Sequence, residues 1–257
     1  MGSLRESLDV VCHQIRLPEN LGAVARLCAN FGFSRIVLSE GGIVSMRDAE
    51  RVAVRGESVL GGVRQEPTLE AAIADAVWVL GTTGRDHVRG RRAMLPEEAC
   101  AKLREHSRRG RVALVLGGEQ RGLSDDDLEK CHGICVIPTR PEQPSMNLAQ
   151  AAAVLLYLCS RADDGQLVVP GTSPSAPNPE PVQSSVDGEA APGARMQTLH
   201  ALEARMKDVL LRAQFLNREA PEHILRELSR SLVKGALTQR EAELWLAAFA
   251  HLGRRCT

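Results

Sequence analysis

Residues 112–123 read Val112-Ala113-Leu114-Val115-Leu116-Gly117-Gly118-Glu119-Gln120-Arg121-Gly122-Leu123. The first five are continuously apolar, which is typical of a parallel strand with both faces covered. The glycines that follow indicate a tight turn. Ser124 and Asp127 come next, with the spacing of an N-terminal capping arrangement. The stretch therefore predicts a buried strand that passes through a glycine turn into a helix.

Short apolar runs alternate with helical periods on both sides of this stretch. This alternation predicts an α/β domain with a mostly parallel sheet flanked by helices. Gly32 fits a C-terminal cap for the first long helix. Strands are expected at Leu8–Cys12, Arg35–Leu38, Val77–Gly81, Val112–Leu116 and Ile134–Ile137. Helices are expected at Leu21–Phe31, Arg47–Ala53, Leu69–Ala74, Glu97–His106, Asp125–Cys131 and Asn147–Ser160.

The composition changes at residues 163–195, which are rich in Pro, Ser, Gly and Asn. Such a segment buries too little apolar surface to offset the ordering of its backbone, so we predict a flexible linker. It separates a domain at residues 1–162 from an all-helical C-terminal extension at residues 196–257. Two or three helices form a small core. We therefore expect the extension to dock on its own domain or on a second subunit.

Charge and cysteine content limit the ligands and the cellular compartment that we expect for this protein. The chain has 257 residues, with 32 Lys and Arg against 32 Asp and Glu, so a nucleic-acid partner would need a local basic patch. None of the seven cysteines forms a CxxC pair, and Cys131 with Cys135 lacks a second pair at zinc spacing. We expect no metal and reduced thiols in the cytoplasm. We also expect no membrane segment, because there is no apolar signal core and no uncharged run of about 20 residues.

Three polar stretches stand at junctions between an apolar run and a helical pattern. They are Asn20–Arg26, Leu116–Leu123 and Pro144–Gln150. Because ligands bind at such junctions in open α/β sheets, we expect one shared site. The glycines of the second stretch would let a ligand approach the backbone, whereas Glu119 would repel the pyrophosphate of a dinucleotide. Ser145 is expected to cap the helix of the third stretch.

Two basic features are open to a plain and a functional interpretation. Arg26 is either a solvated arginine on a surface helix or an arginine that points into a cleft at the sheet edge. The segment from Gly81 to Arg92 carries four arginines and a histidine against one acid. Arginine clusters bind phosphates, although most charged runs are only solvated. The predicted RNA-binding residues are Arg85, Arg89, Arg91 and Arg92.

The three polar stretches resemble the motifs of a known family. Asn20-x-Gly22-x-x-x-Arg26, Gly118-Glu119-x-x-Gly122-Leu123 and Ser145-x-Asn147-Leu148 are similar to motifs one, two and three of the SpoU/TrmH family of SPOUT methyltransferases. The similarity covers about residues 8–160, and the helical tail resembles the TrmJ subgroup. It implies a homodimer, a C-terminal trefoil knot and methylation of the ribose 2′-hydroxyl at nucleotide 32 of the tRNA anticodon loop.

The resemblance also implies residue roles. S-adenosyl-L-methionine would lie in the knot, and Arg26 matches the catalytic arginine of the family. A guanidinium is almost never neutral, so we favour phosphate binding and stabilisation of the developing alkoxide over a role as base. Asn20, Ser145, Asn147 and Glu119 match the other polar positions of the catalytic motifs. The expected cofactor contacts are Thr82, Thr83, Gly117, Gly118, Gly122, Ile137, Pro138, Ser145, Met146 and Leu148.

Two other functions stay open at this point. One is methylation of the ribose 2′-hydroxyl in ribosomal RNA by an enzyme of the same family, and the other is RNA binding by a knotted protein without catalysis. The helical tail follows the catalytic domain, as in the TrmJ subgroup, whereas several enzymes that act on ribosomal RNA carry an extension before it. Arg26, Asn147 and the cofactor-loop glycines disfavour a protein without catalysis.

Overall fold

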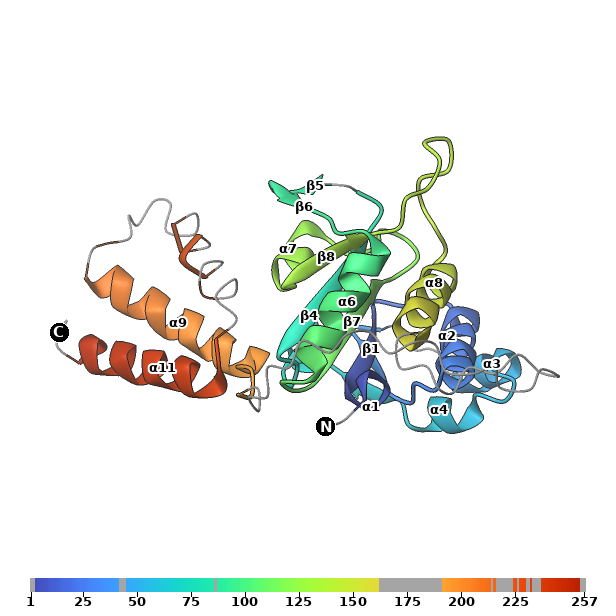
Figure 1. Cartoon of the computed structure of the whole chain (residues 1–257), viewed down its shortest axis with the longest axis horizontal. Helices are drawn as coiled ribbons and strands as arrows, with labels where there is room; N and C mark the ends of the chain where they lie inside the picture. The colour runs from blue at the N-terminus through green and yellow to red at the C-terminus, as the bar shows by residue number, and fades with distance from the viewer. Residues whose placement is uncertain are drawn as a thin grey trace, which may run out of the picture.

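The computed structural model describes residues 3–41, 45–85, 87–161, 191–213, 215, 224–225, 227–229, 232 and 237–254. Within them, six parallel strands form one sheet in the order β3-β2-β1-β7-β4-β8 (Figure 1). The central pair is in register from Leu8 opposite Val112 to His13 opposite Gly117. The strands are β1 (Leu8–His13), β2 (Ile36–Ser39), β3 (Arg64–Glu66), β4 (Trp78–Thr83), β7 (Val112–Gly117) and β8 (Gly133–Val136).

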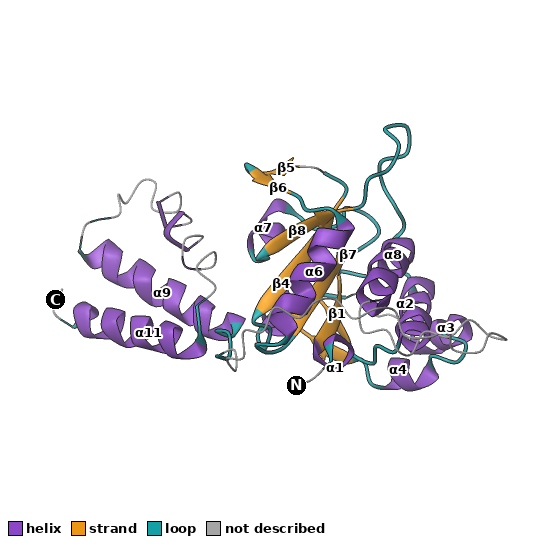
Figure 2. Ribbon diagram, in the orientation of Figure 1, coloured by secondary structure: helices purple, strands orange, loops and turns teal. Residues whose placement is uncertain are grey.

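Helices cover both faces of this sheet (Figure 2). Alternate residues of the central strands divide between two cores: Val10 packs with α2, α6 and α8, whereas Val11 packs with α5, α7 and the start of α9. The helices of the sheet domain are α1 (Leu4–Ser7), α2 (Pro18–Phe31), α3 (Met46–Val52), α4 (Glu57–Gly61), α5 (Leu69–Ile73), α6 (Pro96–Ser107), α7 (Asp125–Glu129) and α8 (Leu148–Ser160). The described helices of the extension are α9 (Met196–Arg212) and α11 (Gln239–Gly253).

The predicted α/β architecture is confirmed, and each predicted strand matches an observed one to within about two residues at its ends. The strand that we missed, β3, is at the sheet edge and reads Arg64-Gln65-Glu66, which is half-exposed and has no apolar run. A second missed feature is the hairpin of β5 (His87–Val88) and β6 (Arg91–Arg92), whose strands have two residues each. Elements this short or this exposed carry little periodicity.

The helix caps confirm two predictions and correct a third. Gly32 ends α2 with a left-handed φ of 78°, and Ser124 with Asp127 forms the capping box of α7. Ser145, however, does not cap α8. Asn147 is the N-cap residue instead, because its side-chain oxygen accepts hydrogen bonds from the amides of Ala149 at 2.8 Å and Gln150 at 3.4 Å. Ser145 is too far upstream of Leu148 to occupy that position.

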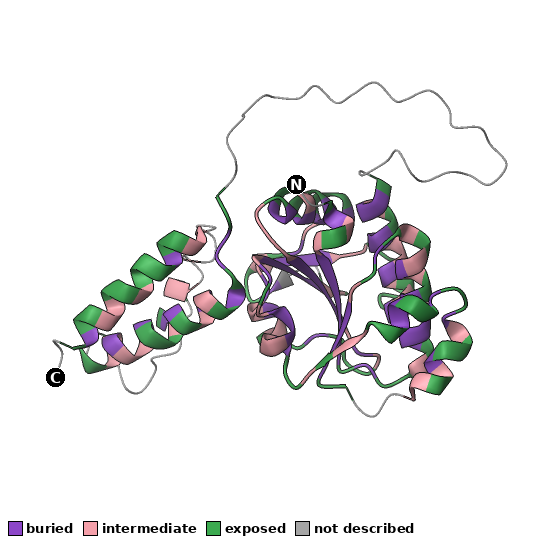
Figure 3. Cartoon of the chain, turned by 90° about the horizontal axis from the view of Figure 1, so that it is seen from below, coloured by how far each residue is buried: buried purple, intermediate pink, exposed green. Residues whose placement is uncertain are grey.

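The helical extension contacts the sheet domain of its own chain at the start of α9 (Figure 3). The amides of Gly193, Met196 and Gln197 donate to the carbonyls of Arg109, Ala76 and Ala74 at 2.8–3.0 Å. Residues 191–195, which we assigned to the linker, are thus bonded to the sheet domain, whereas residues 162–190 lie outside the described residues. The predicted capping box of Thr238 and Glu241 is present at the start of α11.

Three further properties concern only the described parts of the chain. No helix there has the length and apolar character needed to cross a bilayer. No cluster of three or more His, Cys, Asp or Glu side chains there is arranged to hold a metal ion. Six cysteines are buried free thiols, namely Cys12, Cys28, Cys100, Cys131, Cys135 and Cys159.

Candidate functional site

A hydrogen-bonded chain of three side chains joins the three polar stretches. The Asn147 side-chain amide donates to the Asn20 side-chain oxygen at 3.0 Å, and the Asn20 amide donates to Glu119 at 2.8 Å. The Glu119 carboxylate also accepts hydrogen bonds from the backbone amides of Arg16 at 3.1 Å and Leu17 at 3.2 Å. The expected convergence of the three stretches on one place is therefore present in the structure.

Local structure places each of these three side chains. Pro18 begins α2, which puts Asn20 in its first turn, where the side chain is 7% exposed. Glu119 lies just after the end of β7, and Asn147 caps α8. Burial alone would raise the pKa of Glu119, but the hydrogen bonds from Asn20 and the backbone amides hold that pKa below its usual value. Glu119 is therefore an ionised, acceptor-only group that fixes Asn20.

A cavity of about 550 Å³ opens beside this chain, at the carboxyl ends of β4, β7 and β8. Asn147 and Glu119 form part of its wall. Nine of the ten expected cofactor contacts line it, and Pro138 is the exception. The nine are Thr82, Thr83, Gly117, Gly118, Gly122, Ile137, Ser145, Met146 and Leu148. The cavity is also lined by residues that were not among the expected cofactor contacts, namely Gly84, Leu116, Gln120, Arg121, Cys135, Gln143, Pro144 and Ala151.

Two glycines of the β7 turn are also required by close packing of the backbone. A Cβ at Gly118 would overlap the carbonyl oxygen of Gln14, and one at Gly117 would overlap the backbone of Gly122. The amide of Gly122 donates to the carbonyl of Gly118 at 2.9 Å, and Gly122 itself has a φ of 64°. Gly117 and Gly118 thus allow close packing of the turn, in the case of Gly118 on the loop after β1, while the approach of a ligand to the glycines that line the cavity stays a prediction.

This packing predicts the effect of Gly118→Ala. The added methyl group should push the turn away from Gln14 and deform the cavity wall. If the cavity holds the expected cofactor, S-adenosyl-L-methionine, its affinity should fall at least about tenfold, since overpacking costs roughly 1–3 kcal/mol. Isothermal calorimetry measures that affinity. The matched control is Gly61→Ala on α4, where a Cβ meets no atom within 4 Å. Equal affinity of the two variants would contradict the assigned role of the turn.

Arg26 does not join the cavity in the isolated chain. It is exposed on α2, and no hydrogen bond or ion pair links it to another residue within the described segments. In the single chain, Arg26 is therefore a solvated arginine on a surface helix and does not point into the cavity. Ser145 lines the cavity but is exposed.

The predicted RNA-binding arginines lie opposite an acidic helix. Arg85 pairs with Asp125 at 2.6 Å, and Arg89 pairs with Asp126 at 2.7 Å. Arg91 donates to the backbone carbonyls at the end of α7 and just beyond it, at 2.8–2.9 Å. Arg92 is exposed. Three of the four side chains thus have protein partners from residues 125–132, and their role in RNA binding stays a prediction.

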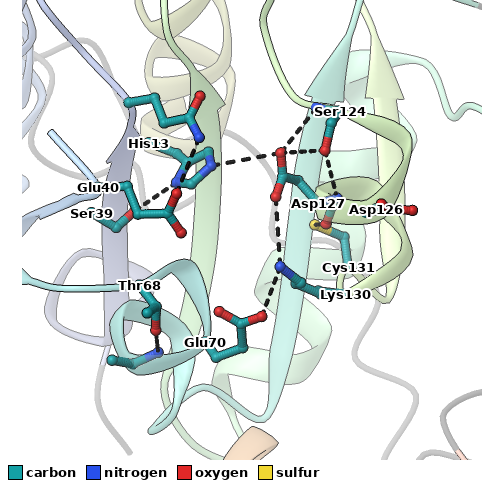
Figure 4. Close-up of polar contacts among 12 residues, drawn as sticks. His13, Ser39, Glu40, Thr68, Glu70, Ser124, Asp126, Asp127, Lys130 and Cys131 are labelled. Carbon is teal, nitrogen blue, oxygen red and sulfur yellow. Dashed lines mark hydrogen bonds and ion pairs between the residues drawn. The ribbon is translucent and has the colours of Figure 1, made fainter.

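A polar network that we did not predict as a whole extends from the buried His13 and Ser39 to the half-buried Asp127, Lys130 and Glu70 (Figure 4). His13 is fully buried at the end of β1, with Nδ1 at 3.0 Å from the Ser39 hydroxyl and Nε2 at 3.6 Å from Asp127. Asp127 accepts hydrogen bonds from the backbone amide and the hydroxyl of Ser124, while Lys130 bridges Asp127 and Glu70. The capping arrangement of Ser124 and Asp127 was predicted, and the histidine at the end of the strand was the signal that could have indicated the rest. The network ties the far end of the turn to the centre of the sheet.

Comparison with known proteins assigns the family. The model of the SpoU rRNA Methylase family matches residues 7–157. A tRNA (cytidine/uridine/adenosine-2′-O-)-methyltransferase TrmJ of Pseudomonas aeruginosa is 30% identical over 93% of this chain and 91% of the relative. A TrmJ of Klebsiella pneumoniae is 27% identical over 93% of both chains. The crystal structure of TrmJ from Z. mobilis superposes with a TM-score of 0.76 at 25% identity, covering 95% of this chain and 98% of that one. The chain therefore belongs to the SpoU methylase family of SPOUT RNA methyltransferases, and within that family to the TrmJ subgroup.

Proposed function

We propose that this chain transfers a methyl group from S-adenosyl-L-methionine to the ribose 2′-hydroxyl of tRNA, at nucleotide 32 of the anticodon loop. The observation that carries the proposal is the Asn147–Asn20–Glu119 chain, which holds three motifs together beside a cavity of about 550 Å³. The relatives from Pseudomonas aeruginosa and Klebsiella pneumoniae are both named as tRNA 2′-O-methyltransferases. The choice of nucleotide 32 rests on the resemblance to the subgroup.

The residues of the cavity fit the proposed cofactor. Its volume is in the range of small-molecule sites, and its wall combines backbone groups with the apolar side chains of Leu116, Ile137 and Leu148. Such a wall suits an adenine ring, whose edge needs a few hydrogen bonds and whose faces need apolar contact. When bound, S-adenosyl-L-methionine supplies an electrophilic methyl group on a sulfonium.

The protein residues would align and stabilise the attacking hydroxyl. Asn20 and Asn147 offer amide donors and acceptors beside the cavity, and Glu119 keeps the Asn20 amide fixed. Alignment of two bound reactants can supply a large part of the rate enhancement. The guanidinium of Arg26 would bind the adjoining phosphate and stabilise negative charge as it develops on the 2′-oxygen. A permanently charged guanidinium suits that role better than removal of a proton.

A homodimer would bring Arg26 to a cofactor site. Arg26 is exposed and lies outside the lining of its own chain's cavity. Helices α2 and α8 pack side by side and leave Tyr157 of α8 45% exposed, next to Phe31 of α2. We propose that this α2–α8 face binds a second copy, so that Arg26 of one protomer serves the cavity of its partner. Analytical ultracentrifugation should therefore report a dimer, and Tyr157→Arg should dissociate it.

We also propose several features that the sequence and its resemblance to the SpoU/TrmH family imply. They include the trefoil knot at the loops of the cavity, the division into residues 1–162, 163–195 and 196–257, and tRNA binding by Arg85, Arg89, Arg91 and Arg92. They also include the cytoplasmic location. Support for a separate helical unit comes from α9 and α11, which pack extensively on each other, while residues 191–195 and the start of α9 also contact the sheet domain.

The deciding experiment incubates the full chain with labelled S-adenosyl-L-methionine and, separately, with total tRNA and ribosomal RNA. We expect label in tRNA alone, and mapping of the modified nucleotide should give position 32 with a 2′-O-methyl ribose. Label in ribosomal RNA alone would show instead that the chain methylates ribosomal RNA, the alternative activity within the family. RNA binding without any transfer would favour the protein without catalysis.

A further inference from the structure

A second cavity of about 430 Å³ adjoins the proposed cofactor cavity. The two cavities share one wall, which consists of Thr82, Thr83, Gly84, Arg121 and Gly122. The second cavity continues outward along the carboxyl end of β4 to Arg85 and along the loop to Ser124 and Asp125. A reactant that occupies the first cavity would therefore have a neighbouring compartment of nucleotide-binding size beside it.

The charges around the second cavity leave one arginine without an acidic partner. Asp125 is paired with Arg85 at 2.6 Å and lies 3.6 Å from Arg89, which also pairs with Asp126 at 2.7 Å. These pairs neutralise the acidic first turn of α7. Arg121 stands on the shared wall, is exposed, and has no ion pair with any residue of the described segments. The charged residues that line the second cavity are therefore Arg85 paired with Asp125, and Arg121, whose guanidinium has no acidic partner within the described segments.

The backbone that carries Arg121 is held firmly. The turn closes through the bond from the Gly122 amide to the Gly118 carbonyl at 2.9 Å, and Gly118 packs against the carbonyl of Gln14. The capping box of Ser124 and Asp127 fixes the other end of the same loop. A guanidinium on such a base is well suited to binding a phosphate, because little backbone entropy remains to be lost. It can also bind the phosphate through two parallel hydrogen bonds.

We propose that the second cavity receives a nucleotide next to the methylated one in the single-stranded RNA loop, and that Arg121 binds its phosphodiester. This inference rests on the proposed function. Proteins recognise unpaired RNA by splaying bases into pockets while cations hold the backbone. The ribose that accepts the methyl group must lie beside the first cavity, so its neighbour in the chain lies one phosphate away. The phosphate that links the two nucleotides would therefore lie at the shared wall, next to Arg121.

The experiment compares Arg121→Gln with Arg108→Gln in the full chain. Arg108 is also exposed, but it lines a different cavity, beside Arg109 and Gly110 near the amino ends of the strands. Both variants lose one positive charge, so a general electrostatic effect would be the same in both. The readouts are direct tRNA binding by fluorescence anisotropy at several salt concentrations, KM for tRNA, and calorimetric affinity for S-adenosyl-L-methionine.

We expect Arg121→Gln to weaken tRNA binding and raise KM for tRNA about tenfold relative to Arg108→Gln, as the loss of one charge-assisted phosphate contact implies. The slope of log affinity against log salt should fall by about 0.7, the value for one phosphate contact in a single strand. Arg121→Lys should recover part of the loss, because the charge returns without the paired hydrogen bonds.

Three results would overturn this inference. The first is equal tRNA affinity and equal salt slope in the two variants. The second is a loss of affinity for S-adenosyl-L-methionine as large as the loss for tRNA, which would assign Arg121 to the carboxylate of the cofactor. The third is full recovery of tRNA binding by an uncharged residue such as Met. Because tRNA binding is measured directly, a wild-type chain that binds tRNA without methylating it would refute the proposed activity while leaving the Arg121 comparison informative.

Discussion

Arg26→Ala should lower kcat for methyl transfer about 1000-fold and leave the affinity for S-adenosyl-L-methionine unchanged. The magnitude is at the upper end of the loss seen when one stabilising donor is removed from a developing oxyanion. The cofactor affinity should survive because Arg26 does not line the cavity of its own chain and, in the proposed dimer, contacts the RNA phosphate and the 2′-oxygen rather than the cofactor. Single-turnover kinetics with tRNA measures the first quantity, and calorimetry measures the second.

Two further variants sharpen this test. Arg47→Ala removes an exposed arginine of α3, a helix that packs against α2, and should keep nearly full activity. Arg26→Lys keeps the charge but loses the planar pair of donors, so it should recover only a small part of the rate. If Arg26→Ala loses methylation and cofactor affinity to the same degree, the side chain supports the structure and does not act on the reacting atoms.

Glu119→Ala should lower kcat/KM at least about 100-fold, a change of roughly 2.7 kcal/mol. The substitution leaves the Asn20 amide and the backbone amides of Arg16 and Leu17 without their shared acceptor. Donors left without an acceptor cost about 1–3 kcal/mol each when buried, and somewhat less at this half-buried site. Asn20 would then lose its fixed orientation, and the three motifs would separate. Activity assays and thermal unfolding measure the two consequences.

The acid dependence of stability gives this prediction a second readout. The folded protein lowers the pKa of Glu119 below its usual value near 4.5, so its contribution to stability is fully present above that pH. The contribution fades as the pH falls through the lowered pKa. The stability difference between wild type and Glu119→Ala should therefore shrink in strong acid. Glu98→Ala on the exposed surface of α6 is the control, and an equal loss of activity there would contradict the role of Glu119.

Local patterns in the sequence predicted the elements of this fold but not the contacts between them. The run that became β7 starts with five apolar residues, and all six residues of β1, including Asp9 and His13, are buried, because both faces of the sheet are covered. The motif resemblance identified the loops of the cavity. The bond between Asn20 and Glu119 spans 99 residues, and the one between Asn147 and Asn20 spans 127. No local periodicity encodes contacts at such separations.

The structure gave contacts at three places that the local sequence did not predict. Ser145 had the chemistry of a cap, but Asn147 is the residue next to the helix. The arginines after β4 formed a basic cluster in the sequence, yet Asp125 and Asp126 lie opposite them in space. His13 gave a weak signal because a single histidine among apolar residues is common in protein cores. Tertiary packing decided the cap of α8 and gave three of these arginines protein partners, while their RNA-binding role stays a prediction.

A crystal structure of the full chain with S-adenosyl-L-homocysteine tests the central claim most directly. We expect the adenine to lie between the Thr82–Gly84, Gly117–Gly122 and Ile137–Leu148 segments, with the Asn147–Asn20–Glu119 chain intact beside it. We also expect the Arg26 guanidinium of the second protomer to lie at the mouth of this cavity, where the acceptor ribose would enter. Adenine bound elsewhere, for example in the larger cavity near Arg108 and Arg195, or an Arg26 that faces only solvent in the assembled dimer, would contradict the account.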